Sequence, residues 1–487
     1  MGLRDLLRRL DPGRSPDPDA PIPVDLGPGQ AHPIDLRWAD ELIANLRGHV
    51  VVRPEDDLLI LVPNRPTKLN RTAVRVLAAM LHEGLSVGQV LEREGDSSSR
   101  RRELHYFFAD LQDLLAGRLG EGRGRRAVEH ERFSADFCRL PVISELALTY
   151  RCNLACAFCY AGCASGGLPP GWDEERRLHR DGFLRALDII HADARCPSVS
   201  FTGGEPTLHP DLEVFVAHAR GLGMKTNLIS NGWLLGDARV AALSRAGLDS
   251  AQLSLEGPDA ARHDALVGKA GAFERLWAGL DRLRGAGVRV HTNTTISRGN
   301  VDVLDGIVEL VADRGLDRLT MNMVIPCGTA TDPATQLAYR EMGSVVSTVQ
   351  QRAESAGVRF IWYSPLPLCL FETPAHGLGS PGCAASDGLL HVNPAGEVLP
   401  CSSFGHHESL GNLLERPFED IWQATGARFF REKRMAPEPC GGCQRVEICQ
   451  GACPLYWRTL GTAEIGGRAD QGPPMPPGFE GGSSPGA

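Results

Sequence analysis

The sequence lacks the marks of a membrane protein, a secreted protein and a general nucleic-acid binder. None of its apolar stretches approaches the length of a membrane span. Residues 1–10 form a short amphipathic piece without the long apolar core of a signal peptide, which predicts a cytoplasmic protein. The formal net charge of −9 argues against the basic surface that nucleic-acid binding needs. We therefore expect neither a membrane nor a nucleic acid among its partners.

Cysteine, in contrast, is abundant, with 14 in 487 residues. Because disulfides are disfavoured in the cytoplasm, clustered cysteines there more often bind metal. Four of them lie between positions 152 and 163, and seven lie between positions 369 and 453. The other three, Cys138, Cys196 and Cys327, stand alone and are predicted to be buried small apolar residues.

The first cluster is a triplet with the spacing C-x3-C-x2-C: Cys152, Cys156 and Cys159, followed by the aromatic Tyr160. Three thiolates can hold three irons of a 4Fe–4S cube and leave the fourth iron open to a substrate or cosubstrate. The alternative is a structural zinc site, which needs four tight ligands. Cys163 would be the nearest fourth ligand.

Strand-like and helix-like segments alternate from residue 143 to about residue 326. Strands are predicted at 143–148, 198–202, 225–230, 250–255, 289–296 and 318–324. Helices are predicted between them at 173–191, 210–222, 236–246, 271–286 and 301–314. Six βα units predict an α/β fold with parallel strands, a partial TIM-like (β/α)6 barrel. The triplet follows the first strand and so belongs at the C-terminal end of the barrel, where active sites lie.

Polar motifs also mark the ends of the next strands. Gly203, Gly204, Glu205 and Pro206 follow the second strand, and the two glycines let the backbone approach a ligand closely. The ends of the third, fourth and fifth strands add Ser230-Asn231-Gly232, Ser254-Leu255-Glu256-Gly257 and Asn293-Thr294-Thr295.

The triplet, with Gly-Gly-Glu-Pro some fifty residues later, resembles the signature of the radical S-adenosylmethionine (SAM) enzymes. The resemblance implies that SAM chelates the open iron of the cluster. It also implies reductive cleavage of SAM to methionine and a 5′-deoxyadenosyl radical, which removes hydrogen from a C–H bond. Its implied SAM contacts are Gly203, Gly204, Glu205, Pro206, Ser230, Asn231, Ser254 and Glu256. Many relatives hold the SAM carboxylate with an Arg shortly before a Gly, and here Val267 stands at that place.

The C-terminal cysteines resemble the SPASM extension of radical SAM enzymes, which carries auxiliary 4Fe–4S clusters. By resemblance, Cys383, Cys401 and Cys453 hold one cluster, with Cys369 as a plausible fourth ligand, and Cys440, Cys443 and Cys449 hold the other. The family motif ends with one more cysteine, which this chain lacks. Asp470 or Glu464 could substitute, or the second cluster could keep an open iron or be absent. A hairpin turn at 393–397 is expected to bring Cys383 towards Cys401.

The N-terminal region is predicted to form a separate winged-helix-like domain. Two short strands, 49–52 and 58–62, precede helices predicted at 72–82, from 85, and at 107–119. The run 69–77 after the strands resembles the peptide-recognition domain of ribosomal-peptide-modifying enzymes, first known from pyrroloquinoline quinone biosynthesis. That domain captures a leader peptide by adding it as a strand to a sheet edge. The arginines at 100–102 and at 123, 125 and 126 would attract an acidic leader.

The expected domain order is therefore a disordered N-terminus at 1–34, the recognition domain at 35–125, the barrel at 138–330, the SPASM extension at 365–460 and a disordered tail at 465–487. The leading hypothesis is a peptide maturase that acts on a peptide or protein substrate. Its cluster would receive electrons from a flavodoxin, a ferredoxin or a chemical reductant. The alternatives are maturation of a whole protein or a metal cofactor, and a non-enzymatic iron–sulfur sensor. No motif assigns a catalytic acid or base.

Overall fold

The computed structural model describes residues 34–116, 138–163, 168–379, 382–468 and 472–479. Its contacts divide the chain into two compact units, residues 1–133 and 134–487. Among the described residues, no helix is both long and apolar enough to cross a membrane. The segment expected to be disordered at 1–34 falls almost wholly outside the described residues, as do Arg123, Arg125 and Arg126.

The N-terminal unit is a three-stranded antiparallel sheet with helices before and after it. Its elements are α2 (Arg37–Leu46), β1 (Val50–Arg53), β2 (Leu58–Leu61), β3 (Arg65–Lys68), α3 (Arg71–Leu81), α4 (Val87–Glu94) and α5 (Ser98–Ala116). The strands lie in the order β1-β2-β3. Apolar residues at helical spacing, such as Val76, Leu77 and Met80 in α3, pack against β1 and β2 in one core. The winged-helix-like order of strands and three helices is confirmed, and α2 and β3 are additions to it.

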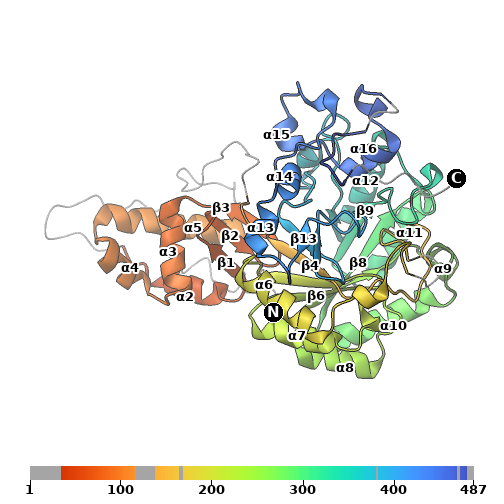
Figure 1. Cartoon of the computed structure of the whole chain (residues 1–487). Coiled ribbons are helices and arrows are strands. Elements are labelled where there is room, and N and C mark those ends of the chain that lie inside the picture. The colour runs from red at the N-terminus through yellow and green to blue at the C-terminus, as the bar shows by residue number, and fades with distance from the viewer. Residues whose placement is uncertain (1–33, 117–137, 164–167, 380–381, 469–471, 480–487) are drawn as a thin grey trace. The chain divides into compact units, whose positions relative to one another are not determined.

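The larger unit is built on a ten-stranded sheet, in which seven consecutive parallel strands form the barrel (Figure 1). They are β4 (Ile143–Ala147), β5 (Ser198–Thr202), β6 (Lys225–Ser230), β7 (Ser250–Ser254), β8 (Arg289–Ile296), β9 (Arg318–Met323) and β10 (Arg359–Trp362). They are paired in chain order, and β10 forms one edge of the sheet, so the sheet stays open. The partial barrel and its first six strands are confirmed, and β10 is a seventh strand beyond the predicted six.

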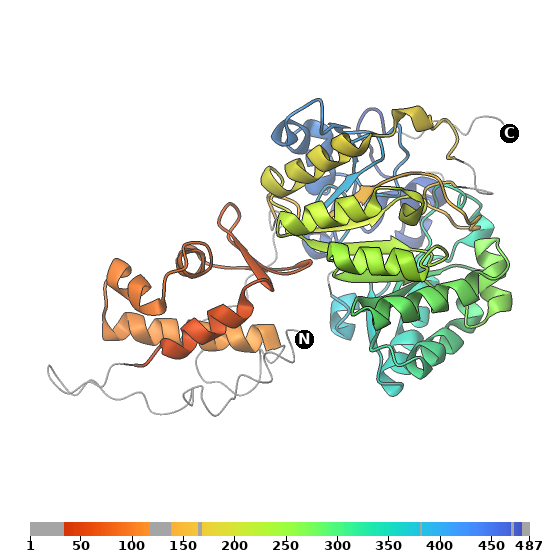
Figure 2. The same ribbon diagram turned by 90° about the horizontal axis from the view of Figure 1, so that it is seen from below.

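Helices cover the outer face of this sheet, as the view from below shows (Figure 2). They are α6 (Arg180–Ala192), α7 (Leu212–Gly221), α8 (Asp237–Ala246), α10 (Ala272–Gly285), α11 (Leu304–Asp313) and α12 (Tyr339–Ser355), and the short helix α9 (Ala260–Val267) precedes α10. Alternate strand residues, among them Leu146, Phe201 and Leu253, are fully buried in the core shared with these helices. Five of these helices match predicted ones, and α9 and α12 are additional.

The other alternate positions of the strands are polar and hydrogen-bond one another across the sheet. Asn293 on β8 donates from Nδ2 to Asn322 Oδ1 on β9 at 2.8 Å. On β4 and the neighbouring strand β11 (Leu389–Val392), Glu145 Oε2 lies 3.0 Å from His391 Nδ1. Because strand residues alternate between faces, these polar side chains belong to the face opposite the helices. The inner face of the barrel is therefore a polar surface.

The C-terminal part continues the same sheet. Its strands are β11 (Leu389–Val392), β12 (Glu397–Leu399) and β13 (Gly411–Asn412), and β11 pairs in parallel with β4. The hairpin predicted at 393–397 is confirmed, since β11 and β12 pair antiparallel and the Asn393 side chain accepts from Glu397 N–H at 3.0 Å. Four helices follow: α13 (Phe418–Trp422), α14 (Thr425–Arg431), α15 (Val446–Cys449) and α16 (Pro454–Leu460).

Short 3-10 turns complete the unit at Glu174–Arg176, Pro206–Leu208, Val301–Val303, Pro333–Thr335, Thr373–His376, Glu438–Cys440 and Ala463–Ile465. The tail expected to be disordered from 465 onward is ordered at residues 472–479. Phe479 there is buried, with its ring 5.4 Å from that of Phe430. The expectation was wrong for this segment because its single aromatic residue finds a place in the core.

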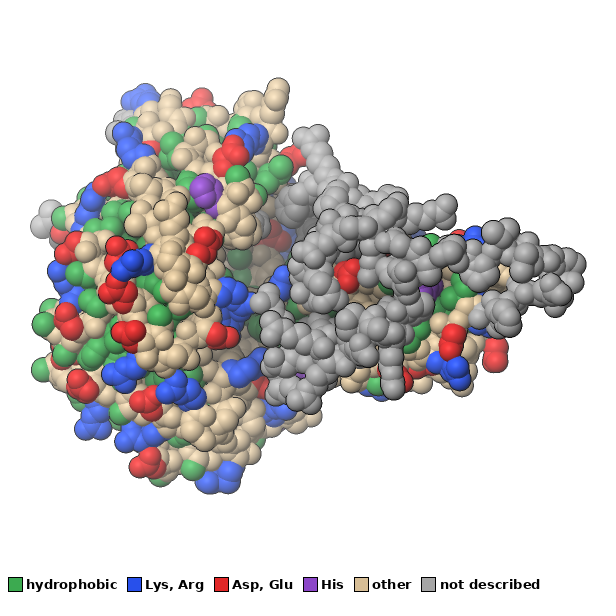
Figure 3. Space-filling model, turned by 180° about the vertical axis from the view of Figure 1, so that it is seen from behind, with side chains coloured by type: hydrophobic (Ala, Val, Ile, Leu, Met, Phe, Trp, Pro, Cys, Tyr) green, Lys and Arg blue, Asp and Glu red, His purple; other side chains and the backbone are tan. Residues whose placement is uncertain are grey.

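Acidic and basic side chains are interspersed on the face of the molecule seen in Figure 3. The exposed helix surfaces carry ion pairs such as Arg282–Asp237 and Arg352–Glu309. No broad area of positive charge is visible on the part of that face that is not covered by grey atoms.

Candidate active site

The cysteine triplet lies in the loop after β4, at the C-terminal ends of the parallel strands. Three other parts of the barrel hold this loop. Leu148 N–H donates to the Thr202 carbonyl at the end of β5, and Ala155 N–H donates to the Val267 carbonyl at the end of α9, both at 2.9 Å. Thr329 completes the support, since its Oγ1 accepts from Cys159 N–H at 2.8 Å and donates to the Cys156 carbonyl at 3.1 Å.

Burial and hydrogen bonding shift the pKa values of the three thiols in opposite directions. Burial dominates at two of them. It raises the pKa of Cys152 to about 12 and the pKa of Cys156 well above its ordinary value. The pKa of Cys159 falls to about 6, chiefly through the Cys163 thiol and then through backbone N–H groups of the loop. The single Cys163 hydrogen has two acceptors in reach, the Cys159 sulfur and the Tyr150 carbonyl at 2.9 Å. Cys163 therefore serves as a hydrogen-bonding neighbour of Cys159 in the triplet.

The two glycines of Gly-Gly-Glu-Pro bring this motif into contact with the cysteine loop. A Cβ on Gly203 would lie 2.2 Å from the Thr149 carbonyl oxygen, and one on Gly204 would lie 2.3 Å from that of Arg151. Gly204 N–H donates to the Thr149 carbonyl at 2.7 Å. The expectation that these glycines make room for a ligand was incomplete, because both approach the chain's own backbone.

Glu205 joins the ends of β5 and β6 through its buried carboxylate. Its Oε1 accepts from Thr207 N–H (3.0 Å), Thr207 Oγ1 (2.6 Å) and Ser230 Oγ (2.9 Å), and its Oε2 accepts from Asn231 N–H (2.8 Å). Burial raises the pKa of Glu205 above its ordinary value, against the effect of these donors. Pro206, also buried, begins the 3-10 turn after it. The polar atoms of Glu205 and Ser230 thus hydrogen-bond within the chain, to each other and to neighbouring residues.

Asn231 reaches from the end of β6 to the triplet. Its Nδ2 donates to Asn153 Oδ1 at 2.8 Å and lies 3.9 Å from Cys152 Sγ. Glu256, after β7, is buried and accepts from Thr295 N–H at 2.9 Å. Its burial raises its pKa to about 8, and its charge contributes to the raised pKa of Cys156. Ser254 ends β7 and is half-buried. The structure thus brings Asn231 and Glu256 to the triplet.

A cation follows the place where Val267 stands. Lys269 Nζ donates to the Asn153 carbonyl at 2.8 Å and lies 4.1 Å from the centre of the Trp233 ring. The glycine between, Gly268, adopts a positive φ of 68° and ends α9. Lys269 was not predicted from the sequence, although this charged residue stands only two positions after Val267.

The C-terminal cysteines form two groups. Cys383 and Cys453 are buried and Cys401 is half-buried, and the charges of Cys383 and Cys453 help to raise the pKa of Cys401. Cys327, just after β9, adds to the same effect on Cys401 and Cys453. Burial raises the pKa of Cys327 itself to about 12. Cys327 is buried as predicted, but it does not stand alone.

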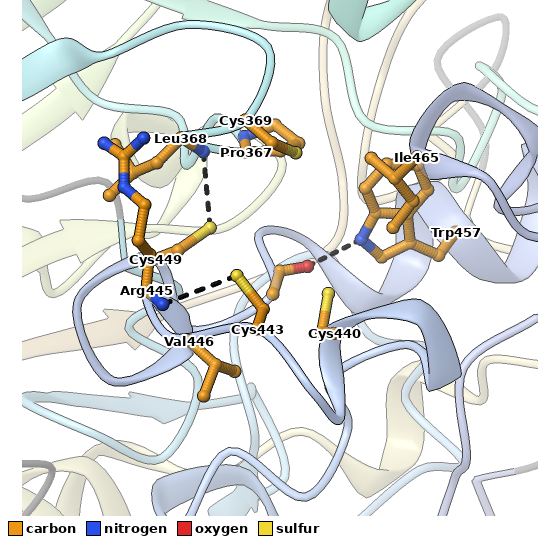
Figure 4. A pocket seen from close by; sticks show the side chains of 11 residues that line it. Pro367, Leu368, Cys369, Cys440, Cys443, Arg445, Val446, Cys449, Trp457 and Ile465 are labelled. Atoms are coloured by element: carbon orange, nitrogen blue, oxygen red, sulfur yellow. Dashed lines mark hydrogen bonds between the residues drawn. The ribbon is translucent and has the colours of Figure 1, made fainter.

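The second group lines a pocket that holds about 390 Å³ of space, its open mouth included (Figure 4). The cysteines in its wall are Cys369, Cys440, Cys443 and Cys449. Cys369, expected as a plausible fourth ligand beside Cys383, lies in this second group, because the turn that carries it packs against α15: Leu368 N–H donates to Cys449 Sγ at 3.3 Å.

Neither proposed substitute ligand is placed at this pocket. Glu464 accepts from Arg340 N–H at 2.9 Å at the start of α12 and from the Tyr456 hydroxyl, so its carboxylate is already engaged. Asp470 lies outside the described residues.

Comparison with known proteins agrees with this geometry. Residues 146–311 match the family model of the radical SAM superfamily, and residues 383–444 match that of an iron–sulfur cluster-binding domain, SPASM. The chain is 31% identical over 319 residues to a PqqA peptide cyclase of Ruegeria pomeroyi, covering 64% of this chain and 82% of the relative. It is 27% identical over 330 residues to an AdoMet-dependent heme synthase of Nitratidesulfovibrio vulgaris, covering 62% and 85%.

The chain belongs to the radical SAM superfamily, in its SPASM-containing branch. The fold agrees, since Streptococcus suis SuiB bound to S-adenosylmethionine superposes with a TM-score of 0.63 at 17% identity, over 83% of this chain and 94% of SuiB. Membership makes the protein an enzyme whose cofactors are SAM, a 4Fe–4S cluster and SPASM iron–sulfur clusters.

The residues present fit these radical SAM cofactors. Three thiols of one loop, Cys152, Cys156 and Cys159, are the donor type that iron–sulfur clusters require, and each lacks a disulfide partner. The two C-terminal groups each offer at least three more thiols. Cys152, Cys156 and Cys159 would hold the cluster, which together with SAM would supply the one-electron chemistry that no side chain provides. The chain contributes the half-buried loop, the thiols on it and a polar inner face.

Proposed function

We propose that this radical SAM enzyme modifies a peptide substrate. The observation that carries the proposal is an added N-terminal unit with an exposed sheet edge. Strand β3 pairs with β2 on one side only among the described residues, and its pattern of exposure leaves Arg65 and Lys68 open to solvent. Such an edge offers backbone N–H and C=O groups to an extended peptide.

The charge beside this edge favours an acidic peptide. Arg71, at the start of α3, is exposed and follows β3 by three residues. Arg75, one helical turn later, is exposed and pairs with Glu94 at 3.0 Å. Arg65 and Lys68 lie on β3 itself, so this edge carries positive charge that would strengthen the capture of an acidic strand at low salt.

Two relatives also support a peptide substrate. A PqqA peptide cyclase acts, by its name, on a peptide, and SuiB has been crystallised with its precursor peptide SuiA. SuiB superposes on 83% of this chain, more than residues 134–487 could supply, so its fold likeness extends into the N-terminal unit. The reductant in this proposal is a flavodoxin or ferredoxin.

A decisive experiment mixes the reconstituted enzyme with SAM, reductant and each short peptide encoded beside the gene. The expected result is peptide-dependent 5′-deoxyadenosine and a changed peptide mass. Arg65→Glu should weaken peptide binding at least severalfold, whereas Arg37→Glu, on a side chain 88% exposed that pairs with Asp35, should not. Unchanged masses with every such peptide, and no binding, would refute the proposal.

The second candidate is maturation of a metal cofactor. Its support is the heme synthase relative, which is 27% identical over 330 residues. An iron tetrapyrrole consumed with SAM, in the absence of any peptide, would favour it.

A further inference from the structure

The pocket in the SPASM segment is walled by four thiols that come from two separate stretches of chain. Cys440 ends a 3-10 turn, and Cys449 ends α15. Cys443 lies between them, and its N–H donates to the Cys440 carbonyl at 3.0 Å. Cys369 comes from about seventy residues earlier, in the turn after β10. Figure 4 shows the four side chains around the same space.

Hydrogen bonds fix the two stretches against each other. Leu368 N–H donates to Cys449 Sγ at 3.3 Å, and Leu370 N–H donates to the Pro367 carbonyl at 2.9 Å, so the turn that presents Cys369 is closed on itself and tied to α15. Arg445 N–H donates to Cys443 Sγ at 3.4 Å. N–H···S bonds of this kind surround cysteine ligands of iron–sulfur clusters and tune their potential.

The effects of the four thiols on one another's pKa values also indicate that they lie close together. Cys449 and Cys443 contribute to the raised pKa of Cys369, and Cys449, Cys369 and Cys443 contribute to that of Cys440. The other C-terminal group has a different neighbour, since Cys327 acts on Cys401 and Cys453. Cys369 is thus associated with one group of cysteines and Cys327 with the other.

We propose that Cys369 is the fourth ligand of the cluster held by Cys440, Cys443 and Cys449. It takes the place of the cysteine that the SPASM motif carries after the position of Cys453 and that this chain lacks. Each iron of this cluster then holds a protein thiolate, so none is open to a substrate. Its role is the transfer of single electrons. The inference rests on the SPASM assignment and is independent of the nature of the substrate.

The test isolates this cluster in the full-length chain. Alanine at Cys152, Cys156, Cys159, Cys383, Cys401 and Cys453 leaves the Cys440 group, which should retain about four irons per chain. Adding Cys369→Ala should lower that iron content or shift the EPR spectrum of the reduced cluster. Cys196→Ala, at a buried cysteine in the barrel core, is the matched control and should leave both unchanged. An unchanged iron content and spectrum after Cys369→Ala would overturn the proposal.

A second background covers the case in which six substitutions prevent folding. Cys440→Ala with Cys443→Ala removes the proposed cluster and leaves the other two. Adding Cys369→Ala should then change neither iron content nor EPR spectrum. A further loss of about four irons, or a new signal, would place Cys369 on the Cys383 group and refute the proposal. Because neither iron content nor the EPR spectrum requires a substrate, a failed search for the peptide substrate would leave this result standing.

Discussion

Gly204 N–H donates to the Thr149 carbonyl at 2.7 Å, so a hydrogen bond joins the loop after β5 to the loop that carries the cysteine triplet. Both partners are backbone groups at adjacent strand ends, and the contact requires a residue without a side chain at position 204. The Gly-Gly-Glu-Pro motif therefore shapes the SAM site through the cluster loop as well as through any contact with SAM.

Gly204→Ala should displace the cysteine loop. The added Cβ would lie 2.3 Å from the Arg151 carbonyl oxygen, and overpacking of this kind costs about 1–3 kcal/mol of unfolding free energy. We expect a folded barrel that retains less iron at the triplet, measured by urea unfolding and by iron analysis of a variant without the SPASM cysteines. Gly221→Ala, with no neighbouring atom within 4 Å, is the control. Equal iron retention in the two variants would contradict this role.

Thr329→Val should loosen the same loop from the opposite side. Its hydroxyl bridges Cys159 N–H and the Cys156 carbonyl, and leaving such groups unsatisfied costs about 1–3 kcal/mol. Faster loss of iron from the triplet to a chelator is the expected result. Thr335→Val, which removes an exposed bond to the Asp332 carbonyl, should not change that rate. If both variants lose iron at the wild-type rate, Thr329 does not support the loop.

His263 should make the stability of the barrel fall in acid. Burial lowers its pKa from 6.5 to about 4, and its Nδ1 accepts from Glu256 N–H at 3.1 Å. The folded state therefore binds fewer protons than the unfolded state between pH 6.5 and 4, so this stabilisation is complete above pH 6.5 and is lost as the pH falls to 4. The loss is about 1.4 kcal/mol per pH unit.

Urea unfolding of the cluster-free protein at pH 7.5 and 5.5 measures this effect. His263→Asn keeps an acceptor at that place but cannot be protonated, so its stability should change less between the two pH values. The same change in both proteins would assign the acid sensitivity to other groups.

Asp56→Ala should destabilise the N-terminal unit alone. Asp56 pairs with Arg53 at 2.7 Å, with both side chains almost fully buried, and breaking a buried pair costs about 3–5 kcal/mol. Calorimetry of the full chain should show one transition moved to lower temperature and the other unchanged. Asp35→Ala, at the exposed pair with Arg37, should move neither by much. A joint shift of both transitions would mean that the units unfold together.

The sequence predicted the parts of the fold that depend on local pattern. Buried strands such as Ser198–Thr202 carry apolar residues between turn signals, and all six expected barrel strands lie within one residue of their predicted ends. Strands β3 and β10 were not predicted because neither has a buried apolar run: β3 is largely exposed and contains Pro66, and only Trp362 of β10 is buried. Helix α9 is only eight residues long, and its apolar face is narrow.

The candidate site was predictable where one motif forms one structure, as in the triplet. It was not predictable where two distant loops meet. Spacing cannot reveal that Cys369 faces Cys449 or that Cys327 lies near Cys401, because each pairing depends on how the turns after β9 and β10 pack. Nor does spacing show that Thr329 holds the loop of Cys159, 170 positions earlier.

The pairing of β11 with β4 has a consequence for dissection of the chain. Strand β4 lies between β5 and β11, and the cysteine triplet follows directly from it. A truncation before residue 389 would leave β4 as an unprotected edge, with its backbone N–H and C=O groups free to recruit strands of other molecules. A shortened barrel without its SPASM segment should therefore aggregate. For this enzyme, domain boundaries drawn on the sequence are not places where the protein can be cut.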